Sequence, residues 1–186
     1  MANKDAAFGL KAIGKVGQNR DNQGLSEYDI AASATAIYQN DPVKMLATGT
    51  IGVAAAGDVL LGPLNGVFFT DASTSKPTYA NHLEASNTAT DIVGFIADDP
   101  YERFEVQSAG TVNQTNIGNC ADISYTAGSA PNYVSKTEIS GTMAATAAQL
   151  KILGVSKDPE NNELGSANAN VVVQIAEHFL NQTAGI

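Results

Sequence analysis

The sequence predicts a mainly β protein, an antiparallel barrel-like or sandwich-like body with an extended N-terminal arm and little helix. Apolar residues make up 44% of the 186 residues, which is enough for a hydrophobic core. Short runs of β-branched and aromatic residues alternate with polar ones at period two. Turn-forming clusters of Gly, Pro, Asn and Asp separate these runs at intervals of roughly 8–15 residues. We therefore expect an arm over residues 1–24 and one β-rich body over residues 25–186.

The N-terminal arm has isolated apolar anchors and no helical stripe. Phe8 and Leu10 stand among glycines, so the segment cannot form a core by itself. It either wraps around its own body or becomes ordered on a partner. Both alternatives stay open at the level of the sequence.

Charge is distributed unevenly along the chain. The net charge is −9, and an acidic body repels phosphate backbones, so nucleic-acid binding by the body is disfavoured. The first twenty residues reverse this trend, because Asp5 is their only acidic residue. Their basic residues are Lys4, Lys11, Lys15 and Arg20. We expect such an arm to lie along an acidic protein partner.

The segment from residue 28 to 62 is the most ambiguous. "YDIAASATAIY" (28–38) contains enough alanine for a helix, yet its larger side chains alternate at period two. We favour a strand–turn–strand interpretation, with the turn at "QNDPV", where Pro42 fixes φ. The following β-branched and glycine-rich residues, 44–62, predict a pair of short strands.

Further strands are predicted along the rest of the chain. The clearest alternation lies at 103–110, where Phe104 and Val106 face one way and the polar residues face the other. The C-terminal run places Val171, Val173 and Ile175 on one face. The other predicted strands lie within 66–71, 90–100, 111–128, 136–140 and 150–155.

Several classes of protein lack support in the sequence. No nucleophile elbow, Walker-type phosphate loop or dinucleotide fingerprint occurs, so we expect no enzymatic activity and no cofactor. Cys120 is the only cysteine, and the histidines His82 and His178 have no Cys or His at metal-ligand spacing. The longest apolar run is interrupted by Pro63 and is too short to cross a bilayer. No run resembles a signal peptide, so we expect synthesis in a reducing cytoplasm.

One stretch, "DDPYERFE" (98–105), concentrates charge and could be mistaken for an active site. Asp98 and Asp99 precede Pro100, which is ordinary turn chemistry. Arg103 supplies a local counter-charge, and the alternation turns Glu105 away from Phe104. A paired-carboxylate hydrolase would also need a second carboxylate across a cleft. We interpret the stretch as a turn between two strands, and we name Asp98, Asp99 and Arg103 as candidate subunit contacts.

A second acidic stretch, "KDPENNELG" (157–165), offers Asp158, Glu160 and Glu163 as oxygen ligands. Their spacing does not match the twelve-residue calcium loop, and such turns are common in hairpins. A bound cation here is a minor alternative, and we expect no metal site.

Several segments together resemble the capsid decoration, or cement, proteins of tailed bacteriophages, especially those of marine and cyanobacterial hosts. Each segment alone is mostly turn chemistry, and their order along the chain carries the resemblance. The segments are "YDIAASATAIYQNDPVKM", "LLGPLNGVFFTDASTSKPTY", "DIVGFIADDPYERFEVQSAGTVNQTNIGNCADI" and "LKILGVSKDPENNELGSANANVVVQIAEHF".

This resemblance implies a structural virion protein that is made in the bacterial cytoplasm and ends on the outer surface of the capsid. Its expected partners are the major capsid protein and further copies of itself, as a homotrimer, with no nucleic acid and no membrane. We expect the arm to contact the capsid through Phe8, Lys11, Lys15 and Arg20. A tail, baseplate or minor capsid component is the alternative within this class, and a carbohydrate- or ion-binding module is the alternative outside it.

Overall fold

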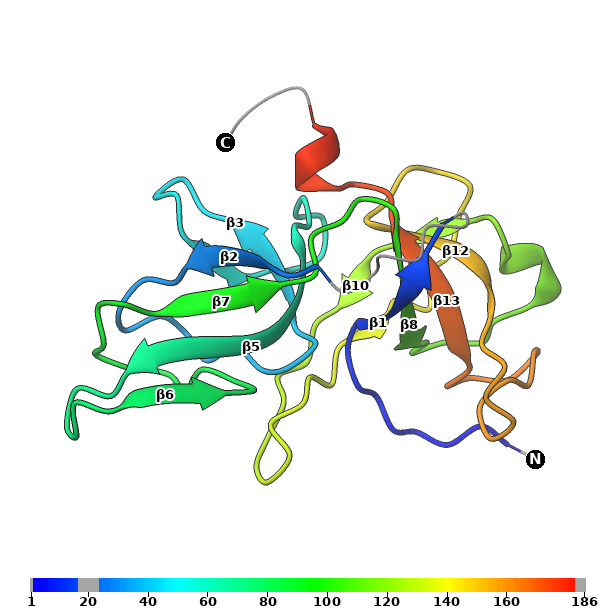
Figure 1. Cartoon of the computed structure of the whole chain (residues 1–186). Helices are drawn as coiled ribbons and strands as arrows, with labels where there is room; N and C mark the ends of the chain where they lie inside the picture. The colour runs from blue at the N-terminus through cyan, green and yellow to red at the C-terminus, as the bar shows by residue number, and fades with distance from the viewer. Residues whose placement is uncertain (1, 17–23, 183–186) are drawn as a thin grey trace.

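The computed structural model describes residues 2–16 and 24–182 as a mainly β protein with antiparallel sheets in a sandwich-like arrangement (Figure 1). The predicted fold class is confirmed. One sheet has five strands in the order β1-β8-β13-β12-β9, and the other has six, in the order β2-β7-β5-β3-β4 with β6 paired to β5. The strands β10 and β11 form a separate two-stranded ribbon. The helical segments described are two short 3-10 turns, η1 (Gln114–Asn116) and η2 (Phe179–Asn181).

The strands are short, as the spacing of turn residues predicts. Their bounds are β1 Lys11–Lys15, β2 Ser26–Asp29, β3 Pro42–Met45, β4 Ile51–Val53, β5 Gly62–Thr70, β6 Pro77–Ala80, β7 Val93–Ile96, β8 Glu102–Gln107, β9 Cys120–Ala121, β10 Ile123–Ser124, β11 Glu138–Ile139, β12 Leu150–Val155 and β13 Asn170–Ile175.

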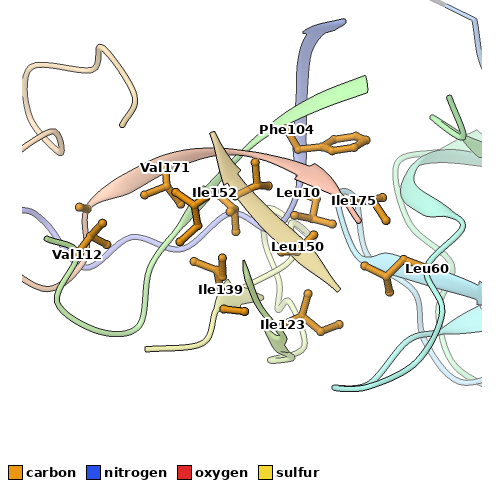
Figure 2. Close-up of a cluster of buried hydrophobic side chains, with 14 of the residues drawn as sticks. Leu10, Leu60, Phe104, Val112, Ile123, Ile139, Leu150, Ile152, Val171 and Ile175 are labelled. Atoms are coloured by element: carbon orange, nitrogen blue, oxygen red, sulfur yellow. The ribbon is translucent and has the colours of Figure 1, made fainter. Parts of the chain in front are cut away.

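Each large sheet covers its own hydrophobic cluster. Inward side chains of β8, β12 and β13 meet beneath the five-stranded sheet, where Phe104, Ile152 and Val173 are buried (Figure 2). This burial follows from the period-two pattern, because Glu102, Phe104 and Val106 all point inward from β8. The second cluster lies beneath the six-stranded sheet, on the inward side of β5 and β7.

The arm lies against its own body over the residues described. β1 pairs antiparallel with β8, and Leu10 is fully buried in the cluster beneath the five-stranded sheet (Figure 2). The Leu10 N–H donates to the Asn40 carbonyl at 3.0 Å. Of the two alternatives that the sequence left open, residues 2–16 therefore adopt the first, packing on the body.

The prediction of one continuous strand over 28–38, before a turn at "QNDPV", is wrong in detail. β2 ends at Asp29, and Ser33 has a positive φ of 61°, which interrupts the alternation. Ile37 makes only an isolated bridge to Leu83. The turn lies at Asn40, with φ 66°, and Pro42 begins β3 instead of belonging to the turn.

Candidate functional site

The two aspartates of the charged turn are both held by internal contacts. Asp98 accepts hydrogen bonds from the Ser26 hydroxyl at 2.9 Å and from the Tyr28 hydroxyl at 2.7 Å, which ties the end of β7 to β2. Asp99 lies 2.5 Å from the Lys15 ammonium and accepts from the Tyr101 N–H at 2.8 Å. The hydrogen bond from Lys15 holds the pKa of Asp99 below its usual value. These carboxylates therefore connect segments of one chain.

Arg103 is placed differently from the two aspartates. It points away from the core on β8, in register with Gly14 of β1 and Gln174 of β13. Its Nε is buried and has no hydrogen-bond partner within residues 2–16 and 24–182. Of the candidate subunit contacts, Arg103 therefore has the strongest unmet requirement for an acceptor.

Glu102 belongs to the stretch 98–105 that we interpreted as a turn between strands, and the structure places it at the start of β8, pointing inward. It is 4% exposed, and this burial raises its pKa. It lines a groove of about 380 Å³ between the arm and the body, together with Leu10, Pro63 and Leu64. Among the described lining residues Glu102 is the one carboxylate, whereas a glycosidase needs two on facing walls.

His178 is buried where the C-terminal segment crosses to the other sheet. It is 0% exposed, it lies in a bridge with Leu60, and its Nδ1 accepts from the Leu180 N–H at 3.1 Å. Burial lowers its pKa, so the imidazole is neutral near pH 7. Its Nε2 has no partner among the described residues. These contacts are those of a structural histidine.

The second histidine, His82, belongs to an aromatic group near the loop around residue 130. Its ring stacks on Tyr133 with centroids 3.8 Å apart, and Tyr38 lies 6.2 Å away in a similar orientation. The His82 Nδ1 is 2.9 Å from the Asn81 Oδ1. Since all these partners lie within the fold, the group fixes a loop against the six-stranded sheet.

The acidic loop at 157–165 holds the arm. Glu160 forms an ion pair of 2.5 Å with Lys4, although both side chains are well exposed. The side-chain amide of Asn161 binds the main chain of Lys4: it donates to the Lys4 carbonyl and accepts from the Lys4 N–H. No group of three or more potential metal ligands occurs among the described residues.

Gln107 is a second residue whose side-chain amide binds the arm. Its Nε2 donates to the Lys4 carbonyl at 2.8 Å, and its Oε1 accepts from the Ala6 N–H at 2.9 Å. We call the amides of Asn161 and Gln107 together the amide clamp. Two amide side chains thus bind the arm through its backbone, as a neighbouring strand would. No local pattern in the sequence indicates this pairing, because its partners lie about a hundred residues or more apart.

The positions named for capsid contact by the arm have different surroundings. Phe8 is half-buried, and its carbonyl accepts from Asn40. Lys15 is committed to Asp99, whereas Lys11 is exposed on the outer side of β1. Arg20 lies outside the described residues.

The outer face of the six-stranded sheet carries a row of aromatic rings that sequence reasoning missed. Phe68 and Tyr79 are paired across β5 and β6, with centroids 4.8 Å apart, and Phe95 of β7 lies 6.4 Å from Tyr79. Tyr79 is 75% exposed. Glu27 pairs with Phe95 in the register, so carboxylate and rings share one face. Alternation within 66–70, 77–80 and 93–96 was the signal that could have identified it.

Neither 3-10 turn in the part of the chain that the structure describes is long enough to span a membrane. Comparison of the sequence with protein-family models and curated proteins, and of the structure with solved structures, found no match.

Proposed function

We propose that this chain is a structural virion protein that decorates the outer surface of a tailed-phage capsid and stabilises it by bridging major capsid protein subunits. The single observation that carries the proposal is the ordered resemblance of four segments to such decoration proteins. Those segments supply most of both sheets, including β5, β7, β8, β12 and β13.

The surface chemistry supports the proposal. Charged residues are 16% of the chain, whereas soluble domains average about 25%. Large apolar side chains remain exposed on several elements, among them Tyr79, Tyr101 and Leu153. A surface of neutral polar and apolar groups suits extensive contact with other proteins.

The arm contributes to this function in a revised form. Because Leu10 lies in the hydrophobic core, we expect removal of the arm to destabilise the body as well as to affect capsid contact. Lys11 remains the arm position best placed to contact a capsid subunit, since it is exposed on an edge strand. Edge strands also offer unpaired backbone groups to a partner strand.

The test is the number and location of copies on purified particles. Quantitative mass spectrometry is expected to find hundreds of copies per particle, in a fixed ratio to the major capsid protein. An electron-microscopy map is expected to place the density on the outer shell. A few copies confined to the tail would support the tail or baseplate alternative, and absence from particles would refute the proposal.

A further inference from the structure

The outer face of the five-stranded sheet is basic, although the chain as a whole is acidic. Arg103 of β8 and Lys151 of β12 flank Gln174 of β13 in one cross-strand row. Lys11 of β1 is paired with Glu105 one row further along. We call the outward residues Lys11, Arg103 and Lys151, with the apolar Leu153 and Val172 beside them, the basic face.

Glu105 is the one carboxylate that the strand register adds to this face. Glu105 accepts a hydrogen bond from the Ser156 hydroxyl, and no ion pair joins it to a cation among the described residues. Lys151 and Lys11 are exposed, while the Arg103 Nε is buried without a described partner. The three cations of this face therefore outnumber its one carboxylate.

The outer face of the six-stranded sheet has the opposite character. Asp29, Val93, Phe68 and Tyr79 lie in one row across β2, β7, β5 and β6, because each is paired with the next in the register. Glu27 and Phe95 form the adjacent row. We call Glu27, Asp29, Phe68, Tyr79 and Phe95 the acidic-aromatic face.

The carboxylates of this face have no cation of their own in the structure. Glu27 and Asp29 are exposed on β2, and neither forms an ion pair with a residue of the described ranges. An exposed aromatic row beside unpaired carboxylates is suited to receive guanidinium and ammonium groups, since these bind both to carboxylates and to ring faces.

We propose that the acidic-aromatic face of one copy packs on the basic face of the next copy, in a head-to-tail contact. Glu27 and Asp29 would meet Lys11 and Lys151, and Arg103 would lie against the rings. The apolar residues Leu153 and Val172 would cover Phe68 and Tyr79. This arrangement gives the two carboxylates and the two lysines an opposite charge, places the Arg103 guanidinium on aromatic rings, and removes the exposed Tyr79 ring from water.

The two faces belong to different sheets, which decides the kind of assembly. A two-fold contact of either face with itself would bring like charges together, which is unfavourable. A contact between unlike faces leaves one of each free, so it repeats, closing into a ring if the rotation between copies closes and extending as a filament if it does not. A closed trimer is one such ring, and it is the homo-oligomer expected for the proposed function.

A saccharide is a poorer fit for the aromatic row. The ring of Phe68 is tilted by 49° to that of Tyr79, whereas Tyr79 and Phe95 differ by 15°. The three rings therefore do not offer one flat surface to a chain of sugars. The self-association inferred here deepens the homo-oligomer of the proposed function, and it rests on that function only for its biological use.

The test reverses the charge of each face separately in the full chain. Light scattering after size-exclusion chromatography is expected to show a closed oligomer for the wild type, weakened by salt. Glu27→Lys with Asp29→Lys, or Lys11→Glu with Lys151→Glu, is expected to raise the dissociation constant at least about tenfold. A chain carrying all four reversals is expected to associate again, because both faces are then inverted together.

Matched controls separate the faces from net charge. Asp5→Lys with Glu84→Lys makes the same charge change as the reversal on β2, and Lys136→Glu with Lys157→Glu matches the other reversal. All four positions are exposed and lie outside both faces. Neither control is expected to change the oligomer, and circular dichroism and melting temperature establish that every variant is folded.

Several outcomes would overturn the inference. A wild type that stays monomeric up to about 100 μM would exclude the interface, because an interface of standard size is expected to have a much lower dissociation constant. So would an oligomer that neither reversal affects, or a fourfold variant that stays dissociated. If the wild type is monomeric and binds a saccharide, and Tyr79→Ser abolishes this binding, the acidic-aromatic face would be a sugar-binding face instead. These results are independent of the copy number on particles, so the two proposals can fail separately.

Discussion

Leu10 tests whether the N-terminal arm is part of the cooperative fold. Its side chain is fully buried beneath the five-stranded sheet, and the pairing of β1 with β8 and the side-chain amides of Gln107 and Asn161 help to hold this segment to the body. Leu10→Ala removes the equivalent of about three methylene groups, at about 0.8 kcal/mol each. A cavity penalty adds to this, so we expect a loss of about 3 kcal/mol in the free energy of unfolding.

The magnitude depends on when the arm detaches. If the arm unfolds together with the sheets, the whole loss appears in the global transition. If the arm leaves first, the loss cannot exceed the free energy of its docking, and a separate transition precedes the main one. The measurement therefore distinguishes a structural arm from a detachable one.

Guanidinium unfolding followed by circular dichroism is the assay for this variant. Hydrogen exchange of peptides covering residues 2–16 shows whether the arm opens before the sheets. Leu25→Ala is the matched control, since Leu25 is 41% exposed, and we expect it to cost less than about 1 kcal/mol. A loss below about 1 kcal/mol for Leu10→Ala would refute the cooperative arm.

Three further substitutions test the packing and electrostatics. Burial raises the pKa of Asp41 to about 6, so the wild type should gain about 2–3 kcal/mol as pH falls from 7 to 4, and Asp41→Asn should lose this gain in pH-dependent unfolding. Lys15 lowers the pKa of Asp99, so the pair stabilises the fold above about pH 4 and this stability is lost on further acidification. Asp99→Asn should reduce the fall in the free energy of unfolding below pH 4 by about 1 kcal/mol. The same fall in the variant as in the wild type would contradict the pairing. Gly62 has φ 154°, and a Cβ there would lie 2.2 Å from the Ala97 carbonyl, so Gly62→Ala should cost about 2–4 kcal/mol in thermal unfolding. Gly154→Ala, with open space, should cost less than 1 kcal/mol.

The β class and the strongest strands could be predicted because their alternation is local. The run from Glu102 to Gln107 shows one buried face in the sequence and in the structure, and so does the run from Asn170 to Ile175. The inward position of Glu102 was missed, because a carboxylate is ordinarily assigned to the surface. Glu102 is paired in the register with Lys15 of β1 and lines the groove beside the arm, and both are remote from it in the sequence.

The prediction of one strand over 28–38 was wrong for a physical reason. Its small residues support a strand and a helix about equally, so tertiary contacts decide. Asp41 accepts a hydrogen bond from the Tyr38 N–H, and the Asp41 N–H donates to the Tyr38 carbonyl, which closes a tight turn. A single sequence does not show which side chain will close a turn in this way.

The candidate surfaces were predictable only in part. Asp98, Asp99 and Arg103 were grouped because they are adjacent in the chain, but the fold uses the two aspartates internally and turns Arg103 outward. The aromatic row needs the register of three strands, β5, β6 and β7, before its members become neighbours.

The pairing of β1 with β8, and of β8 with β13, has a consequence for biosynthesis. The ribosome makes β1 roughly ninety residues before its partner and makes β13 more than sixty residues after β8. Pairings this distant form late and slowly. The six-stranded sheet, by contrast, is complete once residue 96 has been made. The basic arm is therefore unpaired beside a finished sheet until its partner β8 (102–107) emerges, and β8 lacks its second neighbour until residues 170–175 emerge. Chaperones or a second nascent copy can reach these strand edges during that period.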